Sequence, residues 1–329
     1  MRCIVCGNAD NNSVIPVKEK LFGFQDSFDY LECPQCGCLQ IVTIPKNLAK
    51  YYRSDYYSFT KPADYGSLLS RFIRKRQMVY ALTGASKIVG SLSCWANLCE
   101  AYWLRIDGLL QVRTLSTRLT KKSRILDVGC GNGKLLYRMA AAGFKDLRGV
   151  DAFIESDITY SNGVHILKST IDALNGQYDL ITFEHSFEHM PSQLGVLHKI
   201  KTLLSTNGLC LINMPVCSSY AWKHYRDNWV NLDCPRHLCI HSTKSMKVLA
   251  DKAGFNIEKI VFTSRGFQFW GSIQYQKGIA LQSDRSYSIN PSNSIFTKAQ
   301  IQQFEKQANK LNKSGVGDCA AFYLTKKQT

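Results

Sequence analysis

The sequence lacks a hydrophobic run long enough to cross a membrane. Its most suspicious uncharged stretch covers residues 88–99, well short of the roughly 20 residues that a spanning helix requires, and we expect a buried or interfacial helix there. No fixed repeat recurs, which excludes collagen, coiled-coil and other repeat architectures. The first ten residues also lack the apolar core of a secretory signal. We therefore expect a cytoplasmic protein whose 13 cysteines are reduced thiols or metal ligands, not a disulfide framework.

Acidic residues are too few to balance the basic ones. The chain has 41 Lys and Arg against 25 Asp and Glu, a formal net charge of +16. Segments 61–124 and 215–329 each carry a net charge of +9, whereas residues 125–214 carry −2. Basic flanks suit an anionic partner: a phosphorylated or lipid-linked small acceptor, nucleic acid, or the acidic inner surface of a membrane. A solvated basic surface would give the same counts, so charge alone leaves the partner open.

Two C-x-x-C-G motifs near the N-terminus predict a metal site. Four thiolates can surround one tetrahedral zinc ion at about 2.3 Å and leave no open position, which makes such a site structural. Cys38 follows the second motif closely and could be mistaken for a ligand, but the repeated C-x-x-C-G spacing favours Cys36 as the fourth ligand. A module this small lacks enough core to fold alone, so we expect the metal to supply much of its folding free energy. We predict a zinc ribbon over residues 1–45, with strands at 22–24 and 28–31 and the ligands Cys3, Cys6, Cys33 and Cys36.

The next segment, residues 46–123, combines aromatic and basic side chains. A tyrosine-rich run follows Pro45, and residues 67–119 then alternate apolar and basic groups at helical spacing. The tyrosines and arginines could stack on bases or sugars, or they could form a helix packing face with extended cationic side chains. We predict amphipathic helices that link or cap the neighbouring domains.

From residue 124 onward, apolar strands alternate with helical segments. This alternation predicts an α/β domain over residues 124–329, with a parallel sheet, right-handed crossovers and helices on both faces. We predict helices at 242–254 and 297–312. The expected strands are 124–128, 147–151, 164–167, 177–183, 208–214, 256–263 and 320–324.

A glycine-rich turn joins the first of these strands to a helix. In Gly129-Cys-Gly-Asn-Gly133, residues without Cβ let the backbone turn tightly and approach a ligand. Asp151 ends the next strand, where its carboxylate can accept both hydroxyls of a ribose. The sequence therefore predicts a nucleoside derivative as the ligand.

Residues 125–133, Ile-Leu-Asp-Val-Gly-Cys-Gly-Asn-Gly, closely resemble the cofactor loop of class I S-adenosylmethionine-dependent methyltransferases. A nicotinamide site usually lacks an acid at position 127, which argues against a dinucleotide. The resemblance implies a seven-stranded Rossmann-like sheet and S-adenosylmethionine as the methyl donor. It also implies donor contacts for six residues: Asp127, Gly129 and Gly131 around the methionine end, Asp151 on the ribose, and Ile171 and Asp172 beside the adenine.

A second motif follows the fourth expected strand. Within residues 183–191, Phe-Glu-His-Ser-Phe-Glu-His-Met-Pro, the residues His185, Glu188 and His189 are spaced to share one face of a helical turn. The motif resembles the E-x-x-E-H pattern of small-molecule methyltransferases such as the ubiquinone-biosynthesis type, with His185 in place of the first glutamate. The resemblance implies a place near the acceptor, and the replacement leaves open whether a divalent ion binds there; capping and packing by Glu188 and His189 is the alternative. We predict His185 as the general base, since methyl transfer to oxygen requires removal of a proton near neutral pH.

Two downstream clusters complete the predicted site. Residues 231–242 include His237 and are too polar for a core, so we expect them to form a wall of the acceptor site. Residues 267–275 combine aromatic rings with amides, which suits either a sugar ring or an aromatic core patch. Residues 266–316 would be an insertion that covers the active site.

The paired cysteine motifs, the donor loop and the 183–191 motif together resemble bacterial class I methyltransferases with an N-terminal zinc ribbon, often associated with O-antigen and other surface-polysaccharide synthesis. The resemblance implies an enzyme that methylates a sugar hydroxyl. Two alternatives remain: a ribosomal RNA methyltransferase with a zinc module, and a non-catalytic module that binds S-adenosylmethionine or another protein.

Overall fold

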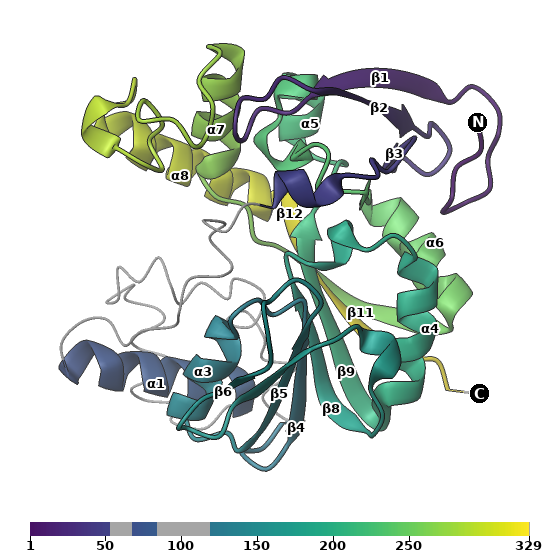
Figure 1. Ribbon diagram of the computed structural model, residues 1–329, viewed down its shortest axis with the longest axis vertical. Coiled ribbons are helices and arrows are strands. Elements are labelled where there is room, and N and C mark those ends of the chain that lie inside the picture. The colour runs from purple at the N-terminus through teal and green to yellow at the C-terminus, as the bar shows by residue number, and fades with distance from the viewer. Residues whose placement is uncertain (53–67, 84–118, 329) are drawn as a thin grey trace.

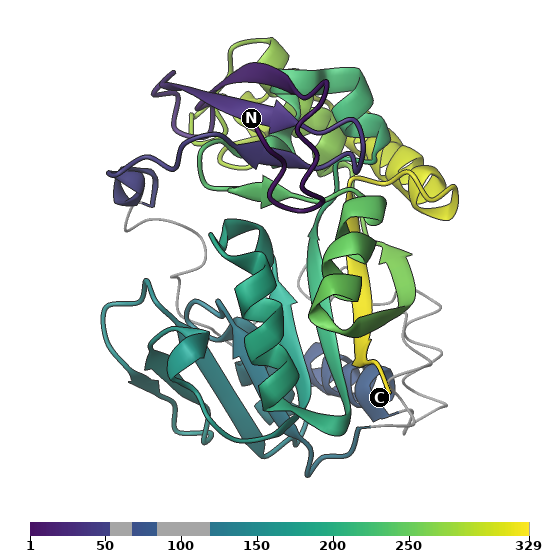
Figure 2. The ribbon, with the colours of Figure 1, turned by 90° about the vertical axis from the view of Figure 1, so that its right-hand side faces the viewer.

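The computed structural model describes residues 1–52, 68–83 and 119–328. The helix expected at 88–99, and most of the segment 46–123, lie outside these residues. Figures 1 and 2 show two parts of the molecule: a large twisted sheet flanked by helices at one end, and the N-terminal strands beside a group of helices at the other. Over the described ranges, none of the helices combines the length and the apolarity needed to cross a membrane.

A mixed eight-stranded sheet forms the centre of the large part, in the order β11-β12-β9-β8-β4-β5-β7-β6. Strands β9, β8, β4, β5 and β7 run parallel, and β12 lies antiparallel between β9 and β11. All seven expected strands are present, which confirms the fold class. Their bounds are β4 Arg124–Val128, β5 Asp146–Asp151, β7 His165–Lys168, β8 Tyr178–Glu184, β9 Leu204–Pro215, β11 Phe255–Phe262 and β12 Cys319–Lys326.

The expected count of seven strands is wrong by one. The additional strand is β6 (Ile158–Thr159), which pairs antiparallel with β7 at the edge of the sheet. Two residues are too few to show the alternation that reveals a strand in a sequence. This edge strand therefore exists only because its backbone finds a partner in the folded molecule.

Helices cover both faces of the large sheet because successive residues of its strands point to opposite sides. Ile125 of β4 packs in one apolar cluster with Leu136 of helix α3, whereas the next residue, Leu126, packs in another with Leu197 of helix α4. The first cluster also takes side chains from α1, and the second from α6. These helices span Leu68–Thr83 (α1), Lys134–Ala141 (α3), Gln193–Leu203 (α4) and Thr243–Ala253 (α6).

The two helices predicted near the C-terminus are confirmed, together with the residues that begin and end them. Ser242 precedes α6 and accepts the backbone N–H of Ser245, and Gly254 ends the helix at a φ of +78°. Thr297 caps α8 in the same way. The helices at this end of the molecule are α5 (Tyr220–Tyr225), α7 (Phe267–Gln276) and α8 (Lys298–Lys313), and the 3-10 turns of the described chain are η1 Leu48–Tyr51, η4 Ile171–Ala173, η5 Phe187–His189, η6 Arg226–Asn228, η7 Val230–Leu232 and η8 Pro291–Asn293.

The N-terminal strands form a second, four-stranded antiparallel sheet in the order β1-β2-β3-β10. Its first three strands are β1 Ser13–Lys18, β2 Ser27–Glu32 and β3 Leu39–Ile41. The fourth, β10 (Cys239–Ile240), comes from far along the chain. The N-terminal strands and α5, α7 and α8 share one apolar cluster, which includes Tyr30, Trp222, Phe269 and Ala308.

The strand expected at residues 22–24 does not form. The buried carboxylate of Glu19 accepts the backbone N–H groups of Phe22 and Phe24, each at 2.9 Å, and these bonds hold the segment in a turn. The strand that pairs with β2 is β1, which comes before this turn. A buried side-chain acceptor thus overrides the local preference of the two aromatic residues for an extended backbone.

Candidate active site

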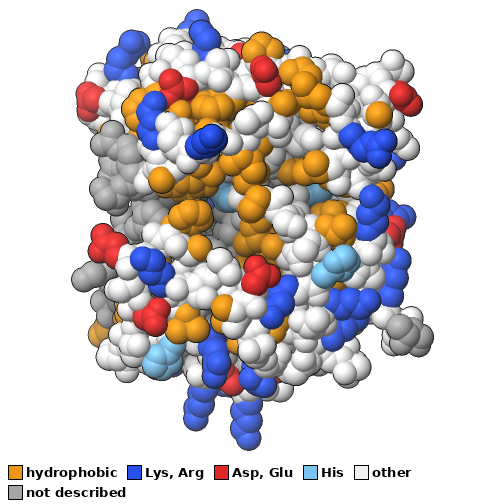
Figure 3. Space-filling model, turned by 45° about the vertical axis from the view of Figure 1, so that its right-hand side comes forward, with side chains coloured by type: hydrophobic (Ala, Val, Ile, Leu, Met, Phe, Trp, Pro, Cys, Tyr) orange, Lys and Arg blue, Asp and Glu red, His pale blue; other side chains and the backbone are white. Residues whose placement is uncertain are grey.

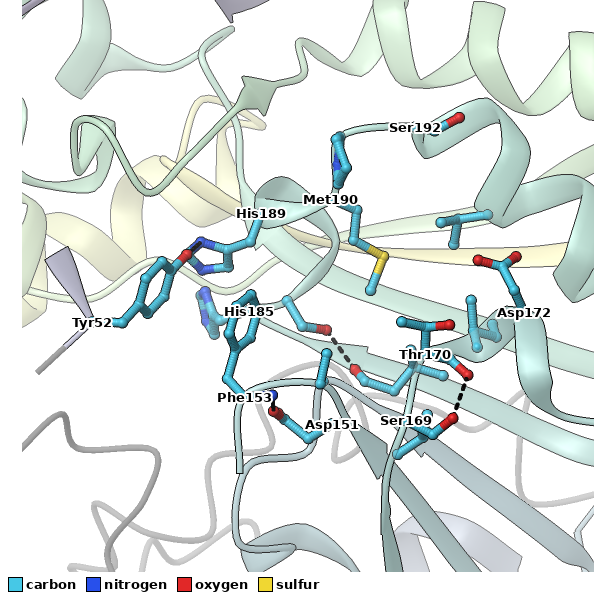
Figure 4. A pocket seen from close by; sticks show the side chains of 18 residues that line it. Tyr52, Asp151, Phe153, Ser169, Thr170, Asp172, His185, His189, Met190 and Ser192 are labelled. Carbon is cyan, nitrogen blue, oxygen red and sulfur yellow. Dashed lines mark hydrogen bonds between the residues drawn. The ribbon is translucent and has the colours of Figure 1, made fainter. Parts of the chain in front are cut away.

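A cavity of about 350 Å³ lies at the carboxyl ends of the parallel strands, where ligands bind in open α/β sheets. Figure 3 shows hydrophobic side chains around a hollow in the surface, with histidine side chains inside it. Six of the predicted site residues line this cavity (Figure 4), namely Gly129, Asp151, Ile171, Asp172, His185 and His189. Of the four others, Gly131 contacts a lining residue, and Asp127, Glu188 and His237 are buried beside the cavity.

The glycine turn and Asp151 hold one another in place. The backbone N–H of Gly131 donates to one carboxylate oxygen of Asp151, and the N–H of Phe153 donates to the other, both at 2.8 Å. Gly129, Gly131 and Gly133 all have positive φ, between +53° and +70°, a region that residues with a Cβ avoid. Asp151, the residue predicted to bind the ribose, is therefore hydrogen-bonded directly to the glycine turn.

Asp127 lies buried behind the glycine turn. Its carboxylate accepts the hydroxyl of Thr182 at 2.7 Å, and only 2% of the residue is exposed. Burial raises the pKa of Asp127 to about 7, against the lowering effect of the Thr182 bond. The carboxylate is thus poised to become fully ionised when a cation binds beside it.

Ile171 and Asp172 line another part of the cavity and lie on the turn η4. Ile171 is buried and Asp172 is exposed, so the turn offers an apolar surface next to a carboxylate. That pairing suits an adenine ring, which stacks on apolar groups and carries an exocyclic amine.

Three of the predicted acceptor-side residues, all histidines, surround the carboxylate of the fourth, Glu188. Glu188 is fully buried, and its Oε1 lies 3.6 Å from Nδ1 of His185 and 3.7 Å from Nε2 of His237. The ring of His189 lies against that of His237, with 4.7 Å between the centroids. Burial alone would raise the pKa of Glu188, but the three histidines lower it below its usual range.

His185 reaches this cluster by an unexpected backbone path. The sequence predicts a single helical turn, whereas the turn η5 begins only at Phe187 and His185 has a φ of +51°. A histidine in the left-handed region is uncommon and costs conformational energy, which is characteristic of functional sites. This conformation places the imidazole in the cavity wall, with 37% of the side chain exposed.

Two backbone carbonyls orient the other two histidines. The Nδ1–H of His237 donates to the carbonyl oxygen of Asn231 at 2.8 Å, and the Nδ1–H of His189 donates to that of Arg236 at 2.9 Å. Burial is the main cause that lowers the pKa of His237 to about 4, and the charge of the neighbouring His189 is the second. This imidazole is therefore neutral at pH 7. The segment 231–237 therefore supplies His237 and two carbonyls that orient the histidines beside the cavity.

Other residues of the two downstream clusters lie elsewhere. His241 is buried between Ser245 and Gln193, to which its ring nitrogens bond at 2.9 and 2.8 Å. The aromatic residues of 267–275 pack within and around α7, and none of that segment is among the lining residues of the cavity. In the described structure this segment is an aromatic core patch, not a sugar platform.

Sequence reasoning missed Tyr52 and Phe153 as parts of the wall. Their rings stack with centroids 5.2 Å apart and an 8° tilt, and the Tyr52 hydroxyl lies 3.0 Å from Nδ1 of His189 (Figure 4). The tyrosine-rich run after Pro45 indicated an aromatic surface, but it did not indicate which tyrosine lines the cavity. Phe153 follows Asp151 by two residues, and its exposure of 60% only has meaning once the cavity is known.

The four predicted cysteines converge at the N-terminal sheet. The sulfurs of Cys3 and Cys36 lie 3.6 Å apart, as do those of Cys6 and Cys33, and all four lie within 4.8 Å of one another. Sulfurs around a tetrahedral zinc ion are separated by about 3.8 Å, given bonds of about 2.3 Å, so the residues fit this ion. Cys38 lies 3.4 Å from Cys3 as a buried fifth thiol.

Comparison with known proteins identifies relatives of the large domain. A family model described as a methyltransferase domain matches residues 105–260. The ubiquinone biosynthesis O-methyltransferase of Rickettsia conorii is 36% identical over 197 residues, which cover 51% of this chain and 68% of that protein. The enzyme of the same name from Rickettsia canadensis is 31% identical over 119 residues, which cover 33% of this chain and 50% of the relative. The chain spans about half the length of this relative and of several others.

Solved structures resemble the chain more distantly. An S-adenosylmethionine-dependent methyltransferase from Thermotoga maritima shares 16% identity with a TM-score of 0.42, covering 76% of this chain and 99% of that one. A cyclopropane synthase from Mycobacterium tuberculosis shares 16% identity with a TM-score of 0.41, covering 63% and 79%. The family match and the similarity to the Rickettsia conorii relative, which extends over two thirds of that protein, show that this chain belongs to the class I S-adenosylmethionine-dependent methyltransferase family.

Proposed function

We propose that this protein transfers a methyl group from S-adenosylmethionine to a hydroxyl oxygen of a small acceptor, a sugar of a surface glycan. The observation that carries the proposal is the composition of the cavity at the carboxyl ends of the parallel strands. Gly129, Asp151 and Ile171 line its donor side, and His185 and His189 line the side beyond the carboxyl end of β8. Donor and acceptor would therefore meet in one enclosed space, as in-line methyl transfer requires.

On the donor side, the chain supplies charges that match a sulfonium nucleoside. When bound, S-adenosylmethionine supplies an electrophilic methyl group. Asp151 would accept the ribose hydroxyls, and Asp127 would face the ammonium group of the methionine end. The apolar surface of Ile171, beside the carboxylate of Asp172, would hold the adenine.

On the acceptor side, His185 would remove the proton from the hydroxyl as that oxygen is methylated. The imidazolium formed in this step would be stabilised by the Glu188 carboxylate, 3.6 Å from Nδ1. The stacked rings of Tyr52 and Phe153 form part of the wall beside His189 and would limit the entry of water. The chain thus contributes alignment, one base and a largely apolar enclosure.

The nature of the acceptor rests on two separate arguments. Relatives named as O-methyltransferases support an oxygen acceptor. The sugar rests on the resemblance to polysaccharide-associated methyltransferases, and the basic segments would meet phosphate on a nucleotide sugar or on a lipid-linked glycan at the membrane surface. An aromatic hydroxyl is the second candidate, because the relatives are named for ubiquinone biosynthesis and the Tyr52–Phe153 stack offers an aromatic wall.

We also propose a division of labour along the chain. Residues 1–45 would form a zinc ribbon with a structural role or a role in holding the acceptor carrier. Residues 46–123 would link and cap the two parts, and residues 266–316 would be an insertion at the acceptor side of the domain 124–329.

The experiment that tests the proposal has two steps. Isothermal titration calorimetry should show binding of S-adenosylmethionine, and no measurable binding would contradict methyl transfer and favour a protein-interaction module. Isotope-labelled donor is then offered with nucleotide sugars, lipid-linked glycans, catechols and ribosomal RNA, and surface glycans from cells with and without the protein are compared by mass spectrometry. Label on catechol or RNA, with an unchanged glycan methylation pattern, would overturn the sugar assignment.

A further inference from the structure

The Glu188 carboxylate is buried without a hydrogen-bond donor. Its side chain is 0% exposed, and within the described parts of the chain neither of its oxygens has a hydrogen-bond partner. An ionised carboxylate in such a place loses its hydration, so burial is unfavourable unless a cation or a set of donors replaces the water. The distances of 3.6 and 3.7 Å to the nearest histidine nitrogens are too long for charge-assisted hydrogen bonds, which span about 2.7–2.9 Å.

Two histidines beside this carboxylate each have one unprotonated ring nitrogen. A carbonyl oxygen can only accept, so the bonds to Asn231 and Arg236 place the protons of His237 and His189 on Nδ1. Each Nε2 then carries a lone pair. Nε2 of His237 faces Oε1 of Glu188, which brings two acceptors together with no hydrogen between them. A histidine that ligates a metal through one ring nitrogen usually donates the N–H of the other to a carbonyl or a carboxylate, and His237 and His189 both donate Nδ1–H to carbonyls.

The spacing of the three side chains fits one ion. Their ligand atoms all lie within 4.8 Å of one another, and ligands around a tetrahedral ion at about 2.1 Å are about 3.4 Å apart. Small rotations of the side chains would close this difference. We propose that Glu188, His189 and His237 bind a divalent transition-metal ion, for which Zn²⁺ is the test case, beside the methyl-donor cavity. Two imidazoles and one carboxylate suit Zn²⁺ or Fe²⁺ and leave a coordination position open.

Buried hydrogen bonds fix the segment that carries His237 and orients His189, and these bonds lie away from the cavity. Arg236, whose carbonyl orients His189, is fully buried and bonds to Asp233 at 2.6 Å and to Glu19 of the N-terminal part at 3.4 Å. The hydroxyl of Tyr30 fixes the carbonyl of His237 at 2.7 Å. His189 itself lines the cavity. An ion in this cluster could therefore reach an acceptor through its open position, and its binding does not rest on the proposed methyl transfer.

The test separates this ion from the one expected in the cysteine cluster. Full-length protein is first saturated with one equivalent of Zn²⁺, which the four thiolates bind, and is then titrated with Co²⁺ under anaerobic conditions. We expect one further equivalent to bind, with visible ligand-field bands but without the thiolate-to-cobalt charge-transfer band that a cysteine site would give. Glu188→Gln and His237→Gln should each weaken Co²⁺ binding at least tenfold, whereas His198→Gln, on an exposed helix surface, should not.

Two outcomes would overturn the proposal: no second ion in the wild-type protein, or equal Co²⁺ affinity in the folded ligand variants. Folding of each variant is checked by circular dichroism. If the variants fail to fold, native mass spectrometry of the wild-type protein decides, because the mass of two ions per chain supports the site and the mass of one contradicts it. Calorimetry with S-adenosylmethionine is independent, so failure of this inference leaves the proposed function standing.

Discussion

At the residue scale, the turn after β4 leaves no room for a single methyl group. A Cβ added to Gly129 would lie 2.5 Å from Cβ of Ser186, whose hydroxyl donates to the carbonyl of Val128. We expect Gly129→Ala to lower affinity for S-adenosylmethionine by roughly tenfold or more, about 1.4 kcal/mol of binding free energy, measured by calorimetry. Gly163→Ala is the matched control, since its φ of +85° imposes similar strain but nothing lies within 4 Å of its Cβ. Equal affinities for the two variants would contradict the close approach.

The buried carboxylate of Asp127 predicts pH-dependent donor binding. Because burial raises its pKa to about 7, the group is mostly protonated at pH 6 and mostly ionised at pH 8. Binding of the donor's cation requires the ionised form, so affinity should rise with pH and level off above 7, with a gain of roughly tenfold from pH 6 to pH 8. Calorimetry at several pH values measures this. Asp127→Asn should bind more weakly and lose the dependence on pH, and a variant that kept it would show that another group titrates.

His185 should matter for turnover and little for donor binding. Its side chain is partly exposed in the cavity wall, whereas Asp151 holds the donor loop. We expect His185→Ala to lower kcat by about 100-fold or more, the usual contribution of a general base, with the affinity for S-adenosylmethionine unchanged. The two quantities are measured with labelled donor and by calorimetry. If turnover survives, His185 is not the base.

At the scale of elements, a buried ion-pair network connects the turn after β1 to the segment that carries His237. Arg236 bonds to Asp233, Glu19 and the carbonyl of Tyr51, and its guanidinium lies 5.5 Å from the ring centroid of Phe22. The side chains of Arg236 and Glu19 are both 0% exposed. Loss of one charge would leave its partners buried without compensation.

We therefore expect Arg236→Met to lower the free energy of unfolding by about 3–5 kcal/mol, measured by urea denaturation. Arg226→Met is the control: its ion pair with Glu32 spans 2.7 Å but its side chain is 44% exposed, so the expected loss is about 1 kcal/mol or less. A similar loss in both variants would mean that burial does not set the strength of the Arg236 network.

At the scale of the whole molecule, the N-terminal part is not an independent unit. Its sheet includes β10, and Tyr30 of β2 bonds to the carbonyl of His237. Loss of order in the cysteine cluster should therefore disturb His237 and the proposed acceptor side of the cavity.

If the four thiolates hold zinc as proposed, removal of the ion by a chelator should lower the melting temperature by roughly 10 °C, because metal binding supplies folding free energy to such a module. Differential scanning calorimetry measures the shift, and the chelator presaturated with calcium is the control for nonspecific effects. A melting temperature that stays constant while zinc is lost, as measured by elemental analysis, would show that the N-terminal sheet is stable without the ion.

The sequence by itself determined the class of fold and the glycine turn that the proposed donor site is built on. Apolar strands alternating with helices specify a parallel sheet, and the glycine turn with Asp127 and Asp151 is a local motif, legible because its parts lie within 25 residues of one another along the chain. The helix ends at Ser242, Gly254 and Thr297 were predictable for the same reason, since a cap depends on neighbours a few residues away.

The sequence suggested His185, Glu188, His189 and His237 for the acceptor side, but only the tertiary structure shows that they meet around one carboxylate and that Tyr52 joins them. Tyr52, Glu188 and His237 lie far apart in the sequence, and their meeting depends on how the N-terminal sheet packs on the segment after β9. The left-handed backbone of His185, the turn held by Glu19 and the pairing of β10 with β3 depend on buried partners in the same way. Spacing along a chain reports local geometry, whereas burial and the pairing of distant groups exist only after the chain has folded.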